Sequence, residues 1–451
     1  MPRPRPNLSR LMADYGMFLI LLLLCGLFSY LTWEEQHPSG ADGARRLARR
    51  LERDGSHSGV ALVVAADGEK EREFATTLAP LLRRMGYEVP EPAIGHPNDA
   101  VDALERLVAA GKPPSLIALT HSARQWPVFD SLAGRYPALA SARIVTPPTY
   151  HWPNFLKAKN LANIADQIVV IAILAVGMTM VIITGGIDLS VGSLIALSAV
   201  VSTLLIRSFA GAENATAGGM VLCCLGGIAV CGAVGAVSGV IVTFAGVPAF
   251  IATLGMMLAA SGLAYLLAEG QSIYQVPDAF TWLGRGFAVP GVANAVVLLV
   301  VLYAGAHVMM SRTVLGRYIY AVGGNAEAAR LSGVPVRGVL LFVYTASGIL
   351  AGLGGVVTAS QLKSGSPTYG LMYELYTIAA VIVGGTSLSG GEGKILGTLI
   401  GAFIIAVIQN GMNLTGVESY TQKVVLGLVI LGAVLLDRLK QRGFSLFRRS
   451  A

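Results

Sequence analysis

The sequence predicts an all-α polytopic membrane protein with about ten transmembrane helices and a small α/β (parallel-sheet) soluble insert. The first observation is composition: of 451 residues, 54% are hydrophobic and 13% are charged, whereas soluble domains carry roughly 25% charged residues. The second is the glycine content, because 54 glycines suit close packing between membrane helices. The third is a stretch at residues 34–153 where charges of both signs return, which predicts the insert.

The N-terminal segment, residues 1–33, predicts a cytoplasmic leader followed by the first transmembrane helix. Arg3, Arg5 and Arg10 precede an apolar run. Residues 15–33 are long enough, at about 20 residues, to cross a bilayer. Leu-Thr-Trp follows the apolar run in place of a small-residue cleavage site. This pattern favours a retained helix over a secretory signal that is removed.

The insert, residues 34–153, predicts an alternation of strands and helices. Continuous apolar and β-branched runs predict strands at residues 60–65, 115–120 and 142–145, with a weaker candidate at 88–94. Helical patterns lie at residues 45–53, 70–85, 98–110 and in part of 127–133. Such alternation favours a parallel sheet with helices on its faces. The helix at 45–53 is basic and amphipathic, and we expect it near the lipid surface.

The order of elements in the insert resembles part of the first lobe of a type I periplasmic sugar-binding protein. Such lobes often place aromatic residues just after the first strand, where this chain reads DGEKE at residues 67–71. The charged segment favours a docking or spacer role for the insert. Binding of a ligand of its own remains the alternative.

Apolar stretches follow one another closely after the insert. With the first helix they make ten predicted spans, the other nine at residues 161–184, 190–208, 217–244, 247–268, 292–311, 337–359, 374–387, 395–412 and 421–437. The span at 374–387 is short for a full crossing, so a re-entrant segment is the alternative there.

Basic residues gather at the two ends of the chain, whose net charge is +7. After the last predicted span they are Arg438, Lys440, Arg442, Arg448 and Arg449. By the positive-inside rule both termini are predicted to be cytoplasmic, which agrees with an even number of spans. Residues 441–451 then form a basic cytoplasmic tail. This charge balance indicates orientation in the membrane lipid, and no nucleic-acid partner is expected.

The run at residues 185–193 (GGIDLSVGS) separates two of the apolar stretches. Gly185 and Gly186 can end one helix, and Asp188 or Ser190 can cap the next. An ionisable group at such a boundary is costly in lipid, so it marks a helix break, a protein-lined cavity or a solvent path. A plain interfacial turn is the alternative.

A second polar segment, residues 311–336, is basic and is therefore predicted to be cytoplasmic. Within it, Asn325 is the expected N-cap of a small helix, and Glu327 complements the helix dipole in the first turn. Gly333 can take the left-handed cap, and Pro335 prevents continuation. A self-contained helix outside the bilayer suits insertion into a groove on a partner, with an unpartnered interfacial loop as the alternative.

Five blocks of sequence identify a family resemblance. They are AVGMTMVIITGGIDLSVGS at residues 175–193, PAFIATLGM at 248–256, LGRYIYAVGGNAEAARLSGV at 315–334, AAVIVGGTSLSGGEGKILGTLIG at 379–401 and NGMNLTGV at 410–417. Because they occur in the right order, the chain resembles the membrane permease subunit of ribose-type (monosaccharide) ABC importers over residues 154–440.

The resemblance implies a transmembrane permease that forms the translocation path for a monosaccharide such as ribose. It implies two ATP-binding subunits, a second permease copy or paralogue and a periplasmic sugar-binding protein as partners. It also implies a multi-pass protein of the bacterial cytoplasmic (inner) membrane, with the insert in the periplasm. The ATPase-coupling helix would comprise Gly324, Asn325, Glu327, Ala328, Ala329, Arg330, Leu331, Ser332 and Gly333.

Residues of the expected path or gate follow from the polar positions near the spans. They are Gly185, Gly186, Asp188, Ser190, Ser193 and Glu374, with Gln361, Lys363 and Tyr373 expected at the outer mouth beside Glu374. An interfacial position for Glu374 and a surface position for Lys363 are the alternatives. The chain departs from the family at Tyr376, where an aspartate is usual, and in carrying the soluble insert.

The sequence predicts a transport subunit and not an enzyme, with no catalytic, metal or cofactor site of its own. Residues 388–392 (LSGGE) look like the signature of ABC ATPases, but a phosphate loop GxxxxGK[ST] is also needed. Its nearest candidate, Gly393-Lys394, continues with Ile395. ATP is therefore expected on partner subunits. The alternatives in other classes are an ion-coupled secondary transporter and a membrane-anchored solute sensor.

Overall fold

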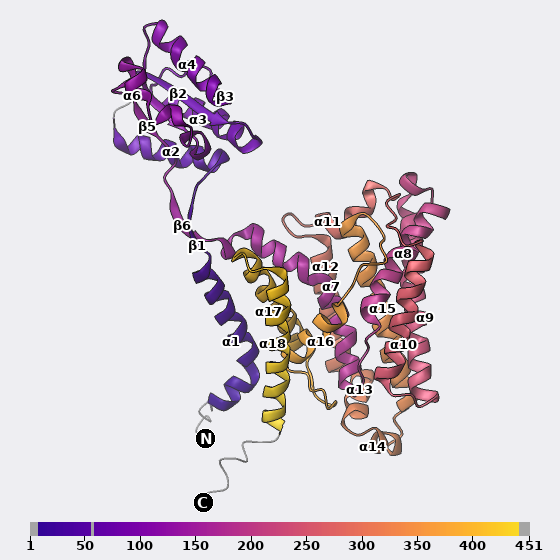
Figure 1. Ribbon diagram of the computed structural model, residues 1–451. Helices are drawn as coiled ribbons and strands as arrows, with labels where there is room; N and C mark the ends of the chain where they lie inside the picture. The colour runs from indigo at the N-terminus through magenta and orange to yellow at the C-terminus, as the bar shows by residue number, and fades with distance from the viewer. Residues whose placement is uncertain (1–7, 56–57, 442–451) are drawn as a thin grey trace, which may run out of the picture. The chain divides into compact units, whose positions relative to one another are not determined.

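The computed structural model describes residues 8–55 and 58–441. It divides the chain into two compact units, one of them Trp33–Pro153 and the other combining the chain before Trp33 with the chain from Asn154 onward (Figure 1). These bounds lie within one residue of the predicted ends of the insert. The predicted leader at residues 1–7 and the basic tail beyond Gln441 lie outside the described residues.

The insert is an α/β lobe around a four-stranded parallel sheet of order β3-β2-β4-β5. Its strands are β2 (Val60–Ala66), β3 (Ala93–Gly95), β4 (Pro114–Leu119) and β5 (Arg143–Val145). Its longer helices are α2 (Gly40–Asp54), α3 (Glu69–Arg84) and α4 (Pro97–Ala109). Short helical pieces follow β4, namely α5 (His121–Arg124), η1 (Pro127–Phe129), α6 (Leu132–Arg135) and η2 (Pro137–Leu139).

Both faces of this sheet are buried, as the continuous apolar runs predict for parallel strands. Successive residues of β2 point to opposite faces: Val63 packs with α2 and α3, and Leu62 and Val64 pack with α4 and the short helices. Pro80 lies inside α3, where its ring does not interrupt the helix. The lobe therefore has a hydrophobic core of its own.

Three details of the insert differ from the sequence-based expectation. The apolar face of α2, including Leu47 and Leu51, is fully buried in the core of the lobe, so it is not free to lie on a lipid surface. The strand predicted at 88–94 is reduced to Ala93–Gly95, because prolines at 90 and 92 cannot donate to a ladder. Residues 127–133, predicted to be part of one helix, form two short helical pieces separated by Asp130 and Ser131.

A two-stranded antiparallel ribbon was not predicted. It pairs β1 (Trp33–Gln36) with β6 (Tyr150–Pro153), so that Trp33 lies opposite Pro153 and Gln36 opposite Tyr150. The Gln36 side chain donates a hydrogen bond to the Trp152 carbonyl at 2.9 Å. The two strands are separated by more than a hundred residues, and neither has the apolar alternation that announces a half-buried strand.

The second unit is a helical bundle. Its long helices are α1 (Leu8–Leu31), α7 (Ala158–Ile183), α8 (Val191–Phe209), α9 (Ala217–Phe244), α10 (Ala249–Leu267), α12 (Asn294–Arg312), α15 (Val336–Leu362), α17 (Ile395–Leu414) and α18 (Ser419–Gln441). Shorter helices are α11 (Trp282–Arg285), α13 (Val314–Gly324), α14 (Ala326–Leu331) and α16 (Tyr373–Val383), with 3-10 turns at η3 (Asn154–Leu156), η4 (Ala212–Asn214) and η5 (Asp278–Thr281).

Seven described helices are long and apolar enough to cross a membrane: α7, α8, α9, α10, α12, α15 and α17. Shorter apolar helices occupy the other three predicted positions, at Gly16–Leu31, Tyr373–Val383 and Ser419–Gly432. Every predicted span thus coincides with an apolar helix, while the total of ten crossings remains a prediction.

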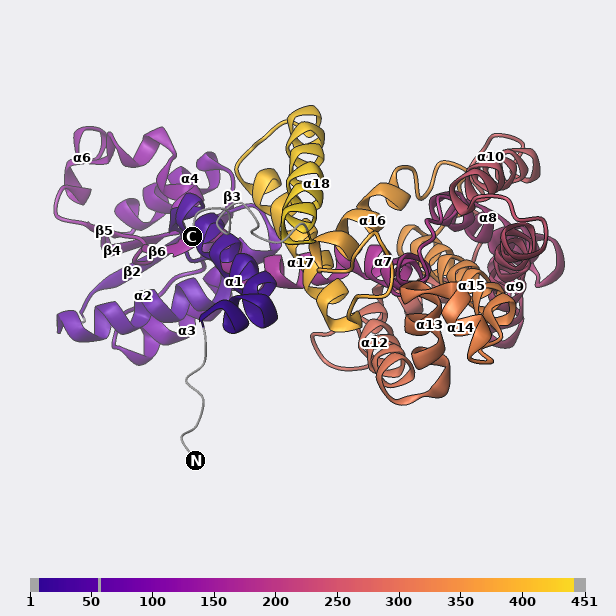
Figure 2. The ribbon, with the colours of Figure 1, turned by 90° about the horizontal axis from the view of Figure 1, so that it is seen from below.

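Helix α7 forms the centre of the bundle. Viewed along the helices, α16 and α17 lie on one side of it and α15 and α8 on the other (Figure 2). The most apolar 18-residue stretch of α7 is 89% buried, whereas that of α10 is 22% buried. A helix that is apolar all round belongs in such a position.

The first helix joins this bundle through α17. Gly411 has no side chain where the ring of Phe28 packs, and the Phe28 and Phe155 rings stack at 6.1 Å between centroids. The Thr32 hydroxyl accepts a hydrogen bond from the Phe155 backbone at 3.1 Å. The chain segments on the two sides of the insert are thereby held together.

Candidate functional site

The candidate site begins with an interruption in the helical architecture. Helix α15 ends at Leu362 and α16 begins at Tyr373, and the chain between them is not helical. Ser364 and Ser366 in this segment are buried, with 3% and 4% exposure. Because a bilayer offers no partners to free backbone groups, non-helical chain at membrane depth is tolerated only inside protein or along a cavity.

This segment runs along α8, antiparallel to it. Gly365 lies against Thr203 and Ala199, near the end of α8, and Gly370 lies against Gly192 at its start. Gly192 and Thr203 are eleven positions apart, which corresponds to about 16 Å along a helix. At the Gly192–Gly370 contact each glycine lacks a side chain exactly where the other backbone passes, so any larger residue would separate the segment from α8.

The polar groups of the segment are largely satisfied inside the bundle. Gly365 exchanges two backbone hydrogen bonds with Ile273, at 2.8 and 2.9 Å. The Ser364 and Tyr369 hydroxyls are 2.5 Å apart, and those of Ser366 and Thr368 are 3.0 Å apart. The segment, which is built mostly of turns, and α16 together therefore form one broken span, in agreement with the short helix predicted there.

A cavity of about 220 Å³ opens where the non-helical segment meets α16. The polar side chains that line it are Ser193, Ser261, Tyr265, Thr368, Tyr369 and Glu374, contributed by α8, α10, the non-helical segment and α16. Glu374 lies in the first turn of α16, where a carboxylate is favoured by the helix dipole. The cavity can hold a small molecule that presents hydroxyl groups.

Two of the residues predicted for a path or gate thus come together. Ser193 and Glu374 line the same cavity although 181 positions separate them in the sequence. Ser261 and Tyr265 were not predicted, because they lie in a helix that is otherwise apolar. The run SPTYG at residues 366–370, which interrupts an apolar region, is the signal that points to this place.

Asp188 and Ser190 lie elsewhere. The Asp188 carboxylate is 1% exposed and accepts hydrogen bonds from the Ser190 hydroxyl at 2.6 Å, the Ser190 backbone at 3.0 Å and the Ser347 hydroxyl at 2.7 Å. It thereby ties the turn between α7 and α8 to α15. Buried carboxylates are stable when they are paired in this way, and this one lines none of the cavities described here.

The remaining predicted positions have distinct surroundings. Gly185 has a left-handed backbone with φ of 81°, and Gly186 leaves room for the Tyr344 hydroxyl. Lys363 forms an exposed ion pair with Asp278, which holds the pKa of Asp278 below its usual value through the hydrogen bond and the charge of Lys363. Tyr376, at the position of the departure from the family, packs edge-on to Tyr373 with centroids 6.4 Å apart.

The small polar helix predicted outside the spans is present as α14. The Asn325 side chain accepts a hydrogen bond from the Ala328 backbone at 2.9 Å, which is the expected N-cap. Ser332 donates its hydroxyl to the Ala328 carbonyl at 2.9 Å, and Gly333 has φ of 84°. Helix α14 lies with α13 at the end of the bundle opposite α11 (Figure 1).

The outer face of α14 carries both charge and an exposed apolar side chain. Leu331 is 77% exposed, whereas Ala329 is buried and anchors the helix. Glu327 and Arg330 form an ion pair. The hydrogen bond and charge of Arg330 hold the pKa of Glu327 below its usual value. An exposed leucine on a capped helix fits an apolar socket on another protein.

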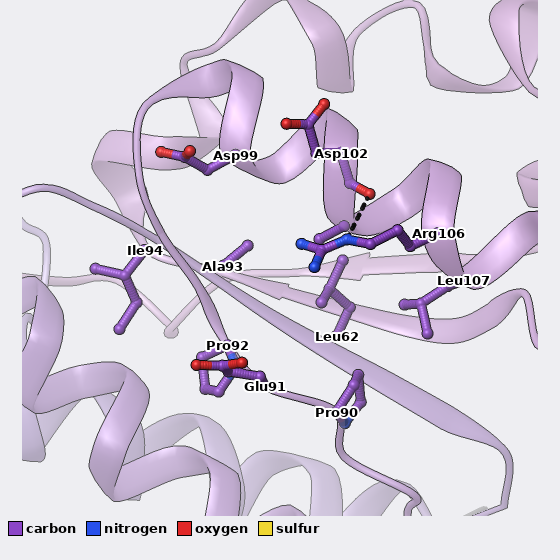
Figure 3. Close-up of a pocket in the computed structure, with 11 residues that line it drawn as sticks. Leu62, Pro90, Glu91, Pro92, Ala93, Ile94, Asp99, Asp102, Arg106 and Leu107 are labelled. Carbon is purple, nitrogen blue, oxygen red and sulfur yellow. Dashed lines mark hydrogen bonds between the residues drawn. The ribbon is translucent and has the colours of Figure 1, made fainter.

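The insert contains a cavity as well, between β3 and α4 (Figure 3). It measures about 400 Å³ and its lining includes Glu91, Asp99, Asp102 and Arg106. Asp99 is engaged as the cap of α4, since it accepts a hydrogen bond from the His96 backbone at 2.7 Å. Arg106 donates to the Asp102 carbonyl at 3.1 Å. The carboxylates point in different directions, so they do not define one ligand position.

Comparison with known proteins identifies the bundle. Residues 160–434 match the family described as "Branched-chain amino acid transport system / permease component". The ribose import permease of Escherichia coli K12 is 46% identical over 293 residues, covering 64% of this chain and 88% of that protein. No solved structure matches this chain.

Two further relatives indicate the breadth of the similarity. The ribose import permease of Bacillus subtilis 168 is 42% identical over 290 residues, covering 64% of this chain and 87% of that protein. The D-allose transport system permease of E. coli K12 is 37% identical over 289 residues, covering 63% of this chain and 85% of that protein.

Proposed function

This chain belongs to the permease family of sugar ABC importers, and on that premise we propose that it forms the translocation path for a monosaccharide such as ribose, driven by separate ATP-binding subunits. The observation that carries the proposal is the broken span, with its polar cavity, in a bundle similar to ribose permeases. Discontinuous spans that line a cavity are typical of transport sites.

The chemistry of the cavity supports passage of a sugar. Glu374 accepts hydrogen bonds, and the hydroxyls of Ser193, Ser261 and Tyr265 both donate and accept. A transport site must bind its solute weakly enough to release it. A cavity of about 220 Å³ with few charged groups meets that requirement. We assign Ser193 and Glu374 to the path and Asp188 to the support of α8.

The contacts of α13 and α14 support a coupling role. Gly323, three residues before the start of α14, packs against the Ile183 carbonyl at the end of α7 and against Gly391 in the loop after α16. Gly391 in turn donates its backbone N–H to Ile183 at 2.8 Å. A displacement of α14 would thus act on the end of α7 and, through the loop that contains Gly391, on the C-terminal end of α16, the helix that bears Glu374.

The proposed assembly contains two ATP-binding subunits, a second permease copy or paralogue and a periplasmic sugar-binding protein. In it the chain lies in the bacterial inner membrane with both termini in the cytoplasm and the insert in the periplasm. The chain itself needs no cofactor, since ATP is bound by the partner subunits. Helix α14 then faces the cytoplasm, at the end of the bundle where α7 terminates.

The test is co-purification with the candidate ATPase subunit in detergent. We expect the wild-type chain to retain the ATPase and Leu331→Glu to lose it, because a charge replaces an exposed apolar anchor. A buried anchor at an interface is worth about 2 kcal/mol, or more than about tenfold in Kd. Phe209→Glu is the matched control, because it also replaces an exposed apolar side chain by a carboxylate. Phe209 is 82% exposed and lies at the C-terminal end of α8, away from α14.

The outcome also separates the proposal from an ion-coupled secondary transporter. The proposal is wrong if neither the wild type nor Leu331→Glu binds the ATPase, and if an ion gradient drives ribose accumulation in vesicles that contain only the wild-type chain. Loss of binding by both Leu331→Glu and Phe209→Glu would instead assign the effect to general damage, and α14 would lose its proposed role.

A further inference from the structure

A second cavity with polar lining residues lies at the end of the bundle opposite α14, where α7 begins and α15 ends. It measures about 480 Å³ and is lined by Asp166, Gln167, Gly284, Arg285, Phe287, Ala293 and Gln361. Small-molecule sites have volumes of roughly 300–1,000 Å³. The cavity shares no residue with the one at Glu374.

Four polar side chains of this cavity have no partner among the described residues. The side chains of Asp166, Gln167, Arg285 and Gln361 form no hydrogen bond or ion pair with any other residue in 8–55 or 58–441. Asp166 and Gln361 are only partly exposed. An ionisable residue on a membrane-spanning helix is costly unless a function retains it, and Asp166 lies on α7.

The scaffold that presents Arg285 is rigid, although its side chain is free. Gly284 donates its backbone N–H to the Ser360 hydroxyl at 2.8 Å, and Ser360 donates to the Phe280 carbonyl at 2.6 Å. Asn294 donates to the Trp282 carbonyl at 2.8 Å and accepts from the Ala288 backbone at 2.7 Å. Side chains presented by a fixed backbone lose little freedom when they bind.

The chemistry of the lining selects a class of ligand. A sugar hydroxyl both donates and accepts hydrogen bonds. A carboxylate accepts, a guanidinium donates and an amide does both, so Asp166, Arg285 and Gln361 complement neighbouring hydroxyls. One acid and one base leave the cavity without a strong net charge, which disfavours ions. Phe287 adds an apolar surface for the sugar ring.

We propose that Asp166, Arg285 and Gln361 form an entry subsite that binds a neutral monosaccharide before it reaches the cavity at Glu374. The inference rests on the proposed function. It places the entry of the solute at the end of the bundle to which the insert is attached. Charge-assisted hydrogen bonds from Asp166 and Arg285 supply most of the affinity.

The test is direct binding of radiolabelled ribose to the full chain in lipid nanodiscs, without a binding protein. We expect saturable binding by the wild type and a rise in Kd of about tenfold or more in Asp166→Asn and in Arg285→Gln, since each removes a charged hydrogen-bonding group. Arg285 is exposed, so its substitution does not threaten the fold. Glu269→Gln is the control, because it neutralises an exposed carboxylate outside the cavity.

Binding of ribose by both variants with the wild-type Kd would overturn the subsite, and so would the absence of saturable binding by the wild type. Co-purification of the ATPase with the same preparations separates the two proposals. If the ATPase is retained while ribose binding is unaffected by either substitution, the entry subsite is wrong and the importer assignment stands. If the wild type binds neither ribose nor the ATPase, both proposals fail.

Discussion

Gly323 and Gly324 are adjacent in the chain but face different surroundings. A Cβ atom on Gly323 would meet the Ile183 carbonyl and the Gly391 backbone, whereas a Cβ atom on Gly324 would meet nothing within 4 Å. Both backbones are compatible with alanine, since neither has a positive φ. Comparing alanine substitutions at the two positions therefore separates the cost of filling a close contact from the general effect of replacing glycine.

At this pair we predict that Gly323→Ala destabilises the bundle and Gly324→Ala does not. Overpacking costs about 1–3 kcal/mol, and more where a fixed backbone cannot move aside. The measurement is the melting temperature of each variant, followed by size-exclusion chromatography after heating. Equal melting temperatures would show that α13 and α7 separate easily, and the proposed route from α14 to α16 would then lose its support.

Helix α14 depends on its caps more than on its length. It has six residues, and a helix this short is unstable alone because nucleation is costly. Asn325 and Ser332 satisfy backbone groups at its two ends, and Ala329 fixes it to the bundle. An element of this kind is rigid only while all three contacts persist.

For this helix we predict that Asn325→Ala weakens the N-terminus by about 1 kcal/mol. Backbone amides of residues 326–332 should then exchange with deuterium about fivefold faster, since that energy corresponds to such a factor. Asn325→Asp retains the accepting oxygen and should exchange like the wild type. Unchanged exchange in Asn325→Ala would mean that packing alone holds α14.

The sequence was informative about α14 because capping is a local property. Asn325, Gly333 and Pro335 are recognisable in their own short segment, and the apolar lengths of the spans are equally local. The cavity at Glu374 is different. It depends on Gly370 meeting Gly192 and on Tyr265 arriving from α10, and such long-range contacts leave no mark in any one segment. The same holds for the pairing of β1 with β6.

At the scale of the whole molecule, the two units each contain a complete core. Residues Trp33–Pro153 form one unit, with α2, α3 and α4 covering both faces of their sheet. In the bundle, Phe28 and Thr32 contact Phe155, which joins the chain before the lobe to the chain after it. Units with separate cores and short connections fold independently of one another.

We therefore predict that the bundle survives removal of the lobe. Replacing residues 37–149 by Asn-Gly would leave β1 and β6 joined by a two-residue turn, which suits the opposition of Gln36 and Tyr150. The shortened chain should elute as a single species and co-purify with the ATPase as proposed for the full chain. Aggregation of the shortened chain, with the full chain soluble under the same conditions, would show that the bundle needs the lobe to fold.

The ribbon has a consequence for how such a chain could arise. The Asn154 backbone donates a hydrogen bond to the Thr32 carbonyl at 2.9 Å, so the polypeptide leaves the bundle and returns to it at a single point. A domain whose N- and C-termini are adjacent can be inserted there without distorting the bundle. The lobe is then an exchangeable module, and other folded domains of similar end-to-end spacing could be inserted at the same point.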